Sequence, residues 1–280
     1  MTLGVALAVL LAAALHASWN ALLRFHGDRL AMATLLAAFS GLLALPGALH
    51  TGLPAPESWP WMALSVLLHV GYNSFLASAY DHGELGRIYP LARGAAPLLI
   101  LSGGALLLHE TLDLPQTAGV VTLAAGILIL AFEGGWRQLV RAPRGAVFAL
   151  ATSVFIAGYT LSDGMGARAA ADAHAYVLWL FVFNAIPLLV YGLLARPAST
   201  AAAFTANWRP GVVGGACSLA AYWIAIWAMT QAPIALVAAL RECSVLFAVM
   251  IGTAFLGETF SWLRLASVLA VTAGLGLLRL

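Results

Sequence analysis

The chain alternates between long apolar runs and short joints rich in glycine, proline and arginine. Crossing a bilayer takes about 20 consecutive apolar residues. Because the joints are short, neighbouring spans are expected to run antiparallel. We predict an all-α membrane protein with ten transmembrane helices. The first five are Leu3–Leu23, Leu30–Leu49, Trp59–Tyr80, Ile88–Leu108 and Pro115–Phe132, and the second five are Ala146–Asp163, Ala173–Leu194, Pro210–Met229, Ala235–Leu256 and Trp262–Leu278.

One long stretch of the chain occurs twice. Tyr89–Leu130 aligns without a gap, at a fixed offset, on Val237–Leu278. Matches between alanines, leucines or valines are expected by chance in apolar helices, so the rarer residue types carry the argument. These rare matches are Arg93 on Arg241, Gly104 on Gly252, Glu110-Thr111 on Glu258-Thr259, and Gly126 on Gly274. An internal repeat of this kind decides the architecture.

The repeat divides the chain into two inverted five-helix repeats. We predict a first repeat over residues 1–133, a basic linker over 134–145 and a second repeat over 146–280. Since five is odd, the second copy enters the membrane upside down relative to the first. Inverted repeats are the plan of many secondary transporters, which bind their substrate near the midplane between the two repeats.

Composition supports the membrane assignment and narrows the partners. Apolar residues make up 62% of the chain, charged residues 9%, and the mean hydropathy is +0.95. A soluble domain carries about a quarter charged residues. The net charge of +2 is too small to indicate nucleic acid, so we expect a lipid bilayer and a small molecule as partners. Cys217 and Cys243 lie inside apolar segments and indicate neither a disulfide framework nor a zinc site.

Arginines in the loops give an orientation. Short cytoplasmic loops carry an excess of basic residues. The rule therefore predicts that both termini lie outside, on the poorer side. The richer side holds Arg24, Arg29, Arg87, Arg137, Arg141, Arg144, Arg196, Arg209 and Arg264, and the poorer side Arg168 and Arg279.

Several short motifs resemble the drug/metabolite transporter superfamily, specifically its EamA-like branch. The resemblance covers the whole chain and rests on His16-Ala17-Ser18-Trp19-Asn20, on the span endings Leu108-His109-Glu110 and Leu256-Gly257-Glu258, and on the glycine-bearing spans around Gly126 and Gly274. It implies export or exchange of small organic metabolites by alternating access, across the inner membrane of a bacterium. Amino acids, aromatic ones in particular, are prominent substrates of such proteins. Many members are expected to have cytoplasmic termini, the opposite of the arginine count.

Polar and aromatic side chains gather on single faces of otherwise apolar spans. His16, Trp19 and Asn20 share one helical face, and Trp223 and Trp227 share another. Such faces are expected to line a cavity, where rings favour flat or amphipathic molecules. The alternative for any one of them is a packed core or an interfacial belt. The predicted substrate cavity comprises His16, Trp19, Asn20, Tyr72, Tyr80, Tyr159, Thr160, Tyr222, Trp223 and Trp227.

Charged residues inside the spans suggest gates. Because the repeats are inverted, Arg93 and Arg241 are expected at opposite faces of the membrane. The hypothesis pairs Arg93 with Glu258 and Arg241 with Glu110. The two ion pairs would form and break in alternation. Glu242 competes as a partner for Arg241, although adjacent helical residues point about 100° apart. The alternative is that both arginines snorkel to the interface and stabilise the structure.

Enzymatic chemistry is not indicated. The segment from His109 begins like a zinc protease helix, but Asp113 stands where the second histidine is needed. The sequence has no Gly-x-Ser-x-Gly elbow and no phosphate-binding loop. We therefore expect no catalytic residue, no metal and no cofactor.

The sequence favours a secondary transporter that exports or exchanges neutral or aromatic amino acids through a central cavity. Ten spans are enough to enclose such a cavity in a monomer. Efflux of hydrophobic cations is the alternative, and it needs an acidic group in the cavity, for which Glu242 and Asp163 are the candidates. A membrane scaffold or receptor that transports nothing is a second alternative, which the inverted repeat disfavours.

Overall fold

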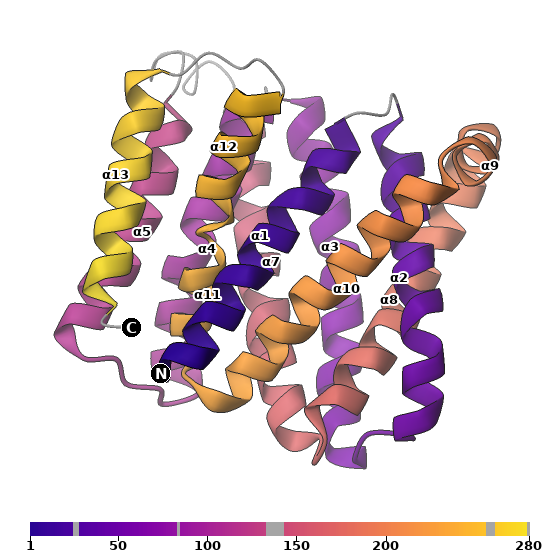
Figure 1. Ribbon diagram of the computed structural model, residues 1–280, viewed down its shortest axis with the longest axis horizontal. Coiled ribbons are helices and arrows are strands. Elements are labelled where there is room, and N and C mark those ends of the chain that lie inside the picture. The colour runs from indigo at the N-terminus through magenta and orange to yellow at the C-terminus, as the bar shows by residue number, and fades with distance from the viewer. Residues whose placement is uncertain (25–27, 83–84, 133–142, 256–260, 279–280) are drawn as a thin grey trace.

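The computed structural model describes residues 1–24, 28–82, 85–132, 143–255 and 261–278, which are helical almost throughout and contain no strand (Figure 1). The first half holds α1 (Leu3–Arg24), α2 (Arg29–Thr51), the 3₁₀ turn η1 (Pro56–Ser58), α3 (Trp59–Asp81), α4 (Leu85–Leu107) and α5 (Leu114–Leu130). The second half holds α7 (Pro143–Ala169), α8 (Ala173–Ala195), α9 (Pro197–Ala206), α10 (Trp208–Gln231), α11 (Ile234–Arg241), α12 (Ser244–Phe255) and α13 (Trp262–Leu277).

Each predicted span overlaps a helix. In the described part of the chain, 8 helical segments are long and apolar enough to cross a membrane, counting the interrupted segment Ile234–Ile251 as one. The segments Leu114–Leu130 and Trp262–Leu277 are apolar but shorter, at 17 and 16 residues. The chain is therefore an all-helical, multi-pass membrane protein.

Local sequence explains where several helices begin. Asp28, Asp113, Asp172 and Ser261 each accept a hydrogen bond from a backbone N–H in the first turn of the following helix. Asp113 also forms a reciprocal capping box with Gln116. Side chains of this kind satisfy donors that the first turn of a helix leaves free.

The structure corrects the prediction at three places. The span predicted as Ala235–Leu256 is two helices, because the backbone turns between Arg241 and Ser244 with hydrogen bonds to residues three positions back. A 3₁₀ interruption in mid-helix often marks a functional hinge. The predicted span Ala146–Asp163 is longer at both ends, as α7. The short helix α9 occupies a predicted joint.

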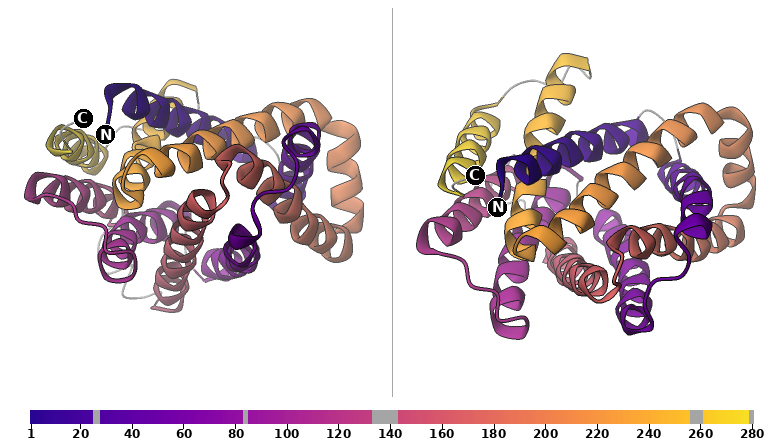
Figure 2. Two further views of the ribbon diagram at one scale, coloured as in Figure 1. Left: turned by 90° about the horizontal axis from the view of Figure 1, so that it is seen from below. Right: turned by 60° about the horizontal axis from the view of Figure 1, so that its bottom comes forward.

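The two halves of the chain pack against each other helix by helix. α3 packs on α7, α1 on α10, α2 on α8 and α5 on α13. Figure 2 shows α5 beside α13 at one edge of the molecule and α2, α8 and α9 at the other. Successive spans run antiparallel, so both termini lie at the same end of the bundle (Figure 1). The side of the membrane that this end faces remains a prediction.

Candidate functional site

A group of ionisable and aromatic side chains lies where α1, α3, α4, α7, α10 and α11 approach one another. Ring contacts or through-space electrostatic interactions link each member to others of the group. We call it the central cluster, and it consists of His16, His69, Tyr72, Arg93, Tyr159, Asp163, Tyr222, Arg241 and Glu242. Ionisable groups inside membrane spans are rare and mark functional positions by default.

Arg93 and Glu242 form a buried, two-pronged ion pair. The Arg93 Nη2 atom lies 2.7 Å from Glu242 Oε1, and Arg93 Nε donates to Oε2 at 3.0 Å. Both side chains are buried. Parallel hydrogen bonds of this kind are the strongest and most specific way to pair a guanidinium with a carboxylate. The pair joins α4 to the interruption between α11 and α12.

Arg241 precedes Glu242 but contacts a ring. Its guanidinium carbon lies 4.8 Å from the centre of the Tyr222 ring, and the residue is 9% exposed. Within the described ranges, Arg241 makes no ion pair or side-chain hydrogen bond. Tyr222 donates its hydroxyl to Asp163 Oδ2 at 2.5 Å, and Tyr176 donates to Oδ1 at 3.1 Å.

Rings from α3, α7 and α10 form an aromatic wall beside these charges. His69 stacks on Tyr159 with 4.1 Å between ring centres, and Tyr72 meets Tyr159 edge-on at 5.8 Å. His69 Nδ1 lies 2.9 Å from the Ser65 carbonyl oxygen, which only accepts. His69 Nδ1 is therefore the donor in this contact.

The structure brings part of the predicted cavity lining together. His16, Tyr72, Tyr159 and Tyr222 belong to the central cluster. Thr160 is buried beside Tyr159 in α7.

The remaining predicted lining residues lie in other surroundings. Trp19 packs on the core around α2 and meets His16 only edge-on, while the Asn20 amide donates to the His16 carbonyl. Trp223 donates to His174 near the start of α8. Residues three or four apart lie on one face of a helix but at different positions along its axis. The spacing alone therefore does not predict which neighbouring helix each one contacts. Trp227 and Tyr80 pack into two separate hydrophobic clusters.

Glu110 forms an end latch rather than the predicted pair with Arg241. Its Oε1 lies 2.7 Å from Arg168 Nη2, and its Oε2 accepts from the Ile234 N–H at 2.9 Å. Arg168 also donates to the carbonyls of Met229 and Ala232. In this conformation Arg241 lies about two turns, or roughly 10 Å, further along α11 than the Ile234 amide that Glu110 accepts from. A pair of Arg241 with Glu110 in another conformation stays a prediction.

The other predicted gate pair is incomplete. Arg93 is engaged by Glu242, and Glu258 lies outside the described residues. Glu242 was expected as a competing partner for Arg241, but it pairs with Arg93 instead.

Sequence reasoning underweighted Ser65, His69, Asp163 and Arg168. Ser65, His69 and Tyr72 recur at helical spacing on one face of α3, and Asp163 follows Tyr159 by one turn of α7. That spacing was the available signal for the first three. Nothing local marks Arg168, because its partners come from the distant segments around Glu110 and Met229.

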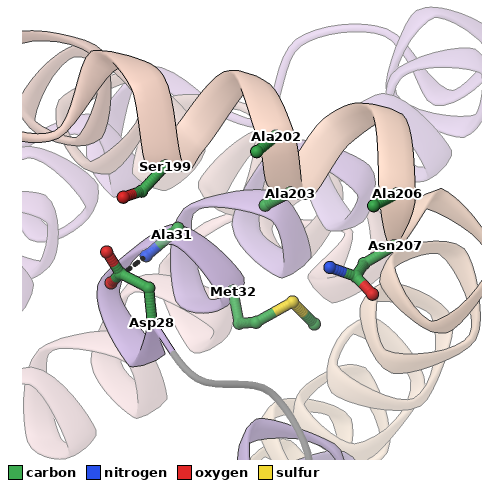
Figure 3. A pocket seen from close by; sticks show the side chains of 8 residues that line it. All are labelled: Asp28, Ala31, Met32, Ser199, Ala202, Ala203, Ala206 and Asn207. Atoms are coloured by element: carbon green, nitrogen blue, oxygen red, sulfur yellow. Dashed lines mark hydrogen bonds between the residues drawn. The ribbon is translucent and has the colours of Figure 1, made fainter.

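A separate pocket of about 270 Å³ lies between α2 and α9 (Figure 3). Alanines form much of its wall, and Asp28 closes one side. The hydrogen bond from the Ala31 backbone N–H is the largest cause that lowers the pKa of Asp28. The pocket shares no residue with the central cluster. In the part of the chain that the structure describes, no group of three His, Cys, Asp or Glu residues could hold a metal ion.

Comparisons with known proteins support the fold and the class. Residues 143–280, from α7 to the C-terminus, match the EamA-like transporter family. No curated protein matches the chain. Among 28 matching solved chains is one titled "Crystal structure of protein", with a TM-score of 0.75 and 20% identity. That match covers 98% of this chain and 94% of the other, and at this identity it shows the fold alone.

Proposed function

We propose that this protein is a secondary transporter of small organic metabolites, with neutral and aromatic amino acids as its substrates. The observation that carries the proposal is the central cluster beside the interruption of α11 and α12. Discontinuous helices near the midplane are typical of transporter substrate sites. Buried charges are costly in a membrane, so their concentration in one place favours a functional role.

Packing between α5 and α13 supports an inverted repeat. A Cβ atom on Gly126 would lie 3.0 Å from Val271 N, and a Cβ atom on Gly274 would lie 2.8 Å from Leu123 N. The offset that aligns the repeats carries Gly126 onto Gly274 and Leu123 onto Val271. Each contact is therefore the image of the other, as two-fold symmetry requires. Alternating access by rocking of two related halves follows from such an arrangement.

The end latch supplies a gate on the side of the termini. Glu110 and Arg168 tie the segment after α4 to the C-terminal end of α7, the carbonyls ending α10 and the first N–H of α11. Release of these bonds frees several helix ends together. A matching gate at the opposite end, Arg93 with Glu258, stays a prediction, because Glu258 lies outside the described residues.

Aromatic substrates suit the rings of the central cluster. His69, Tyr72, Tyr159 and Tyr222 present their faces or edges from three helices. His69, Tyr72 and Tyr222 are intermediate in burial, which is compatible with contact between their rings and a bound molecule. A flat apolar ligand gains from apolar burial and from offset or edge-on ring contacts.

Efflux of hydrophobic cations is the weaker candidate. It needs an available carboxylate, but both oxygens of Glu242 are engaged by Arg93. Asp163 is fully buried and accepts from Tyr176 and Tyr222. A role as a scaffold or receptor predicts no flux of any solute.

Uptake into proteoliposomes tests the proposal. The experiment measures entry of radiolabelled phenylalanine, with and without an imposed proton gradient, against protein-free liposomes. Saturable uptake that unlabelled tryptophan or tyrosine inhibits is the expected result. Arg241→Gln is expected to abolish uptake, whereas Arg209→Gln, at an exposed arginine, serves as the matched control. Folded protein that transports no amino acid would overturn the proposal.

A further inference from the structure

Arg241 is a buried cation that forms no ion pair within the described residues. The side chain lies at the end of α11, inside the bundle, with 9% of the residue exposed. In the described part of the chain, no carboxylate lies within ion-pair distance of it. An unpaired charge in such surroundings is costly, so an arginine is retained there only when something offsets the cost.

The neighbouring acids are already engaged. Glu242 follows Arg241 directly, yet Arg93 holds both of its carboxylate oxygens. Asp163 accepts hydrogen bonds from the Tyr222 and Tyr176 hydroxyls. Glu242 also attracts Arg241 through space, but its hydrogen bonds go to Arg93, so the N–H donors of Arg241 are left for another anion.

The contacts that Arg241 makes stabilise its charge and leave its N–H donors free to bind a ligand. The Tyr222 ring lies under it at 4.8 Å, which is attractive at a ring face. The C-terminal end of α11 also favours a cation. Neither contact uses the fork of N–H donors that binds a carboxylate through two parallel hydrogen bonds.

We propose that Arg241 binds the carboxylate of the transported molecule. The proposal rests on the proposed function and adds the substrate class: molecules with one carboxylate and a flat apolar body, amino acids included. The carboxylate lies on the Arg241 fork, and the apolar body packs on the partly exposed rings of Tyr222, His69 and Tyr72. An amino group is not required by any contact in this arrangement.

Ligand-dependent thermal stability of the purified protein tests the assignment without transport. The probes are 3-phenylpropionate, which has the acid without the amine, and phenethylamine, which has the amine without the acid. Phenylalanine and its methyl ester form a second matched pair. We expect the unblocked acids to raise the melting temperature, and the amine and the ester to leave it unchanged.

Variants at Arg241 assign the effect to this residue. For Arg241→Gln, affinity for 3-phenylpropionate is expected to fall about 10- to 100-fold, the range of a hydrogen-bonded charge pair. Arg241→Lys keeps the charge but loses the fork of N–H donors. Its affinity for 3-phenylpropionate is therefore expected to lie between those of the unmodified protein and Arg241→Gln. Arg209→Gln, at an exposed arginine, is expected to bind like the unmodified protein.

Three outcomes contradict the proposal: stabilisation by phenethylamine but not by the acid, no stabilisation by any probe, or equal binding to Arg241→Gln. If that variant does not fold, the acid, amine and ester comparison on the unmodified protein still decides. Binding of the acid through Arg241 without amino-acid uptake would sustain this inference and overturn the proposed function. Amino-acid uptake that the methyl ester inhibits as well as the acid does would overturn this inference alone.

Discussion

Tyr222 contacts both Arg241 and Asp163. Its ring face lies 4.8 Å from the Arg241 guanidinium carbon, and its hydroxyl donates to the Asp163 carboxylate at 2.5 Å. A hydroxyl that donates to an anion leaves its ring richer in electrons, which strengthens the attraction of that ring for a cation. Tyr222 therefore couples two opposite charges that do not touch.

The two contacts of Tyr222 can be separated by substitution. Tyr222→Phe keeps the ring and removes the hydroxyl that donates to Asp163, so it is expected to lower the free energy of unfolding by about 1.5–3 kcal/mol. Binding of 3-phenylpropionate should persist. Tyr222→Leu removes the ring as well and is expected to weaken that binding. Thermal unfolding and ligand titration measure the two effects, and equal ligand affinity in the two variants would contradict the role of the ring.

The Arg93–Glu242 pair is expected to behave as a unit. Arg93→Leu or Glu242→Leu alone leaves one buried charge unpaired, at a cost of about 3–5 kcal/mol. The double variant is expected to recover most of that stability, because two leucines need no partner. A double-mutant cycle on thermal unfolding gives the coupling energy. Additive losses in the double variant would show that the two side chains do not stabilise each other.

The end latch should not survive exchange of its charges. Glu110→Arg with Arg168→Glu restores opposite charges but removes the acceptor for the Ile234 N–H and the donors for two carbonyls. Glu110→Ala is expected to cost about 1–3 kcal/mol through the unpaired N–H. Glu110→Gln keeps an acceptor and should lose less, since the partly exposed ion pair adds about 0.2–1 kcal/mol. Full rescue by the exchanged pair would contradict the capping role.

The close approach of α5 to α13 depends on glycine. Gly126→Val places a side chain against the Val271 backbone, which cannot move aside as a flexible side chain could. We expect a loss of about 1–3 kcal/mol of unfolding free energy. Gly276→Val is the control on α13, because nothing lies within 4 Å of its Cβ position. Equal stability of the two variants would indicate that the helices separate freely.

We expect the stability that Asp28 gives to α2 to depend on pH. The backbone N–H of Ala31 lowers the pKa of Asp28 in the folded protein, so its cap stabilises α2 fully above the ordinary value, about 3.9. That stability is lost as the pH falls through the lowered pKa. Asp28→Ala should cost about 0.5–2 kcal/mol at neutral pH. Asp28→Asn keeps an acceptor and should remove the acid dependence, which unfolding measured between pH 3 and pH 7 can check.

The sequence predicted the spans and the duplicated stretch because residue types along the chain are enough to recognise both. Apolar length marks each helix that crosses the membrane, and rare residues such as Arg93 and Arg241 mark the repeat. It also placed His16, Tyr72, Tyr159 and Tyr222 among the candidates, because polar or aromatic residues are conspicuous in apolar helices. Their presence in one cluster was a consequence of the bundle packing.

Tertiary structure alone decided which charges meet. The sequence made Glu110 a candidate for Arg241, yet in this conformation Glu110 pairs with Arg168. The interruption after Arg241 carries no proline or glycine, so no local signal predicted it. Partner choice depends on the crossing of helices far apart in sequence, where burial makes each pairing exclusive. The amino-acid sequence determined which residues would need a partner, and the packing of α4, α7 and α10 around α11 determined which partner each one found.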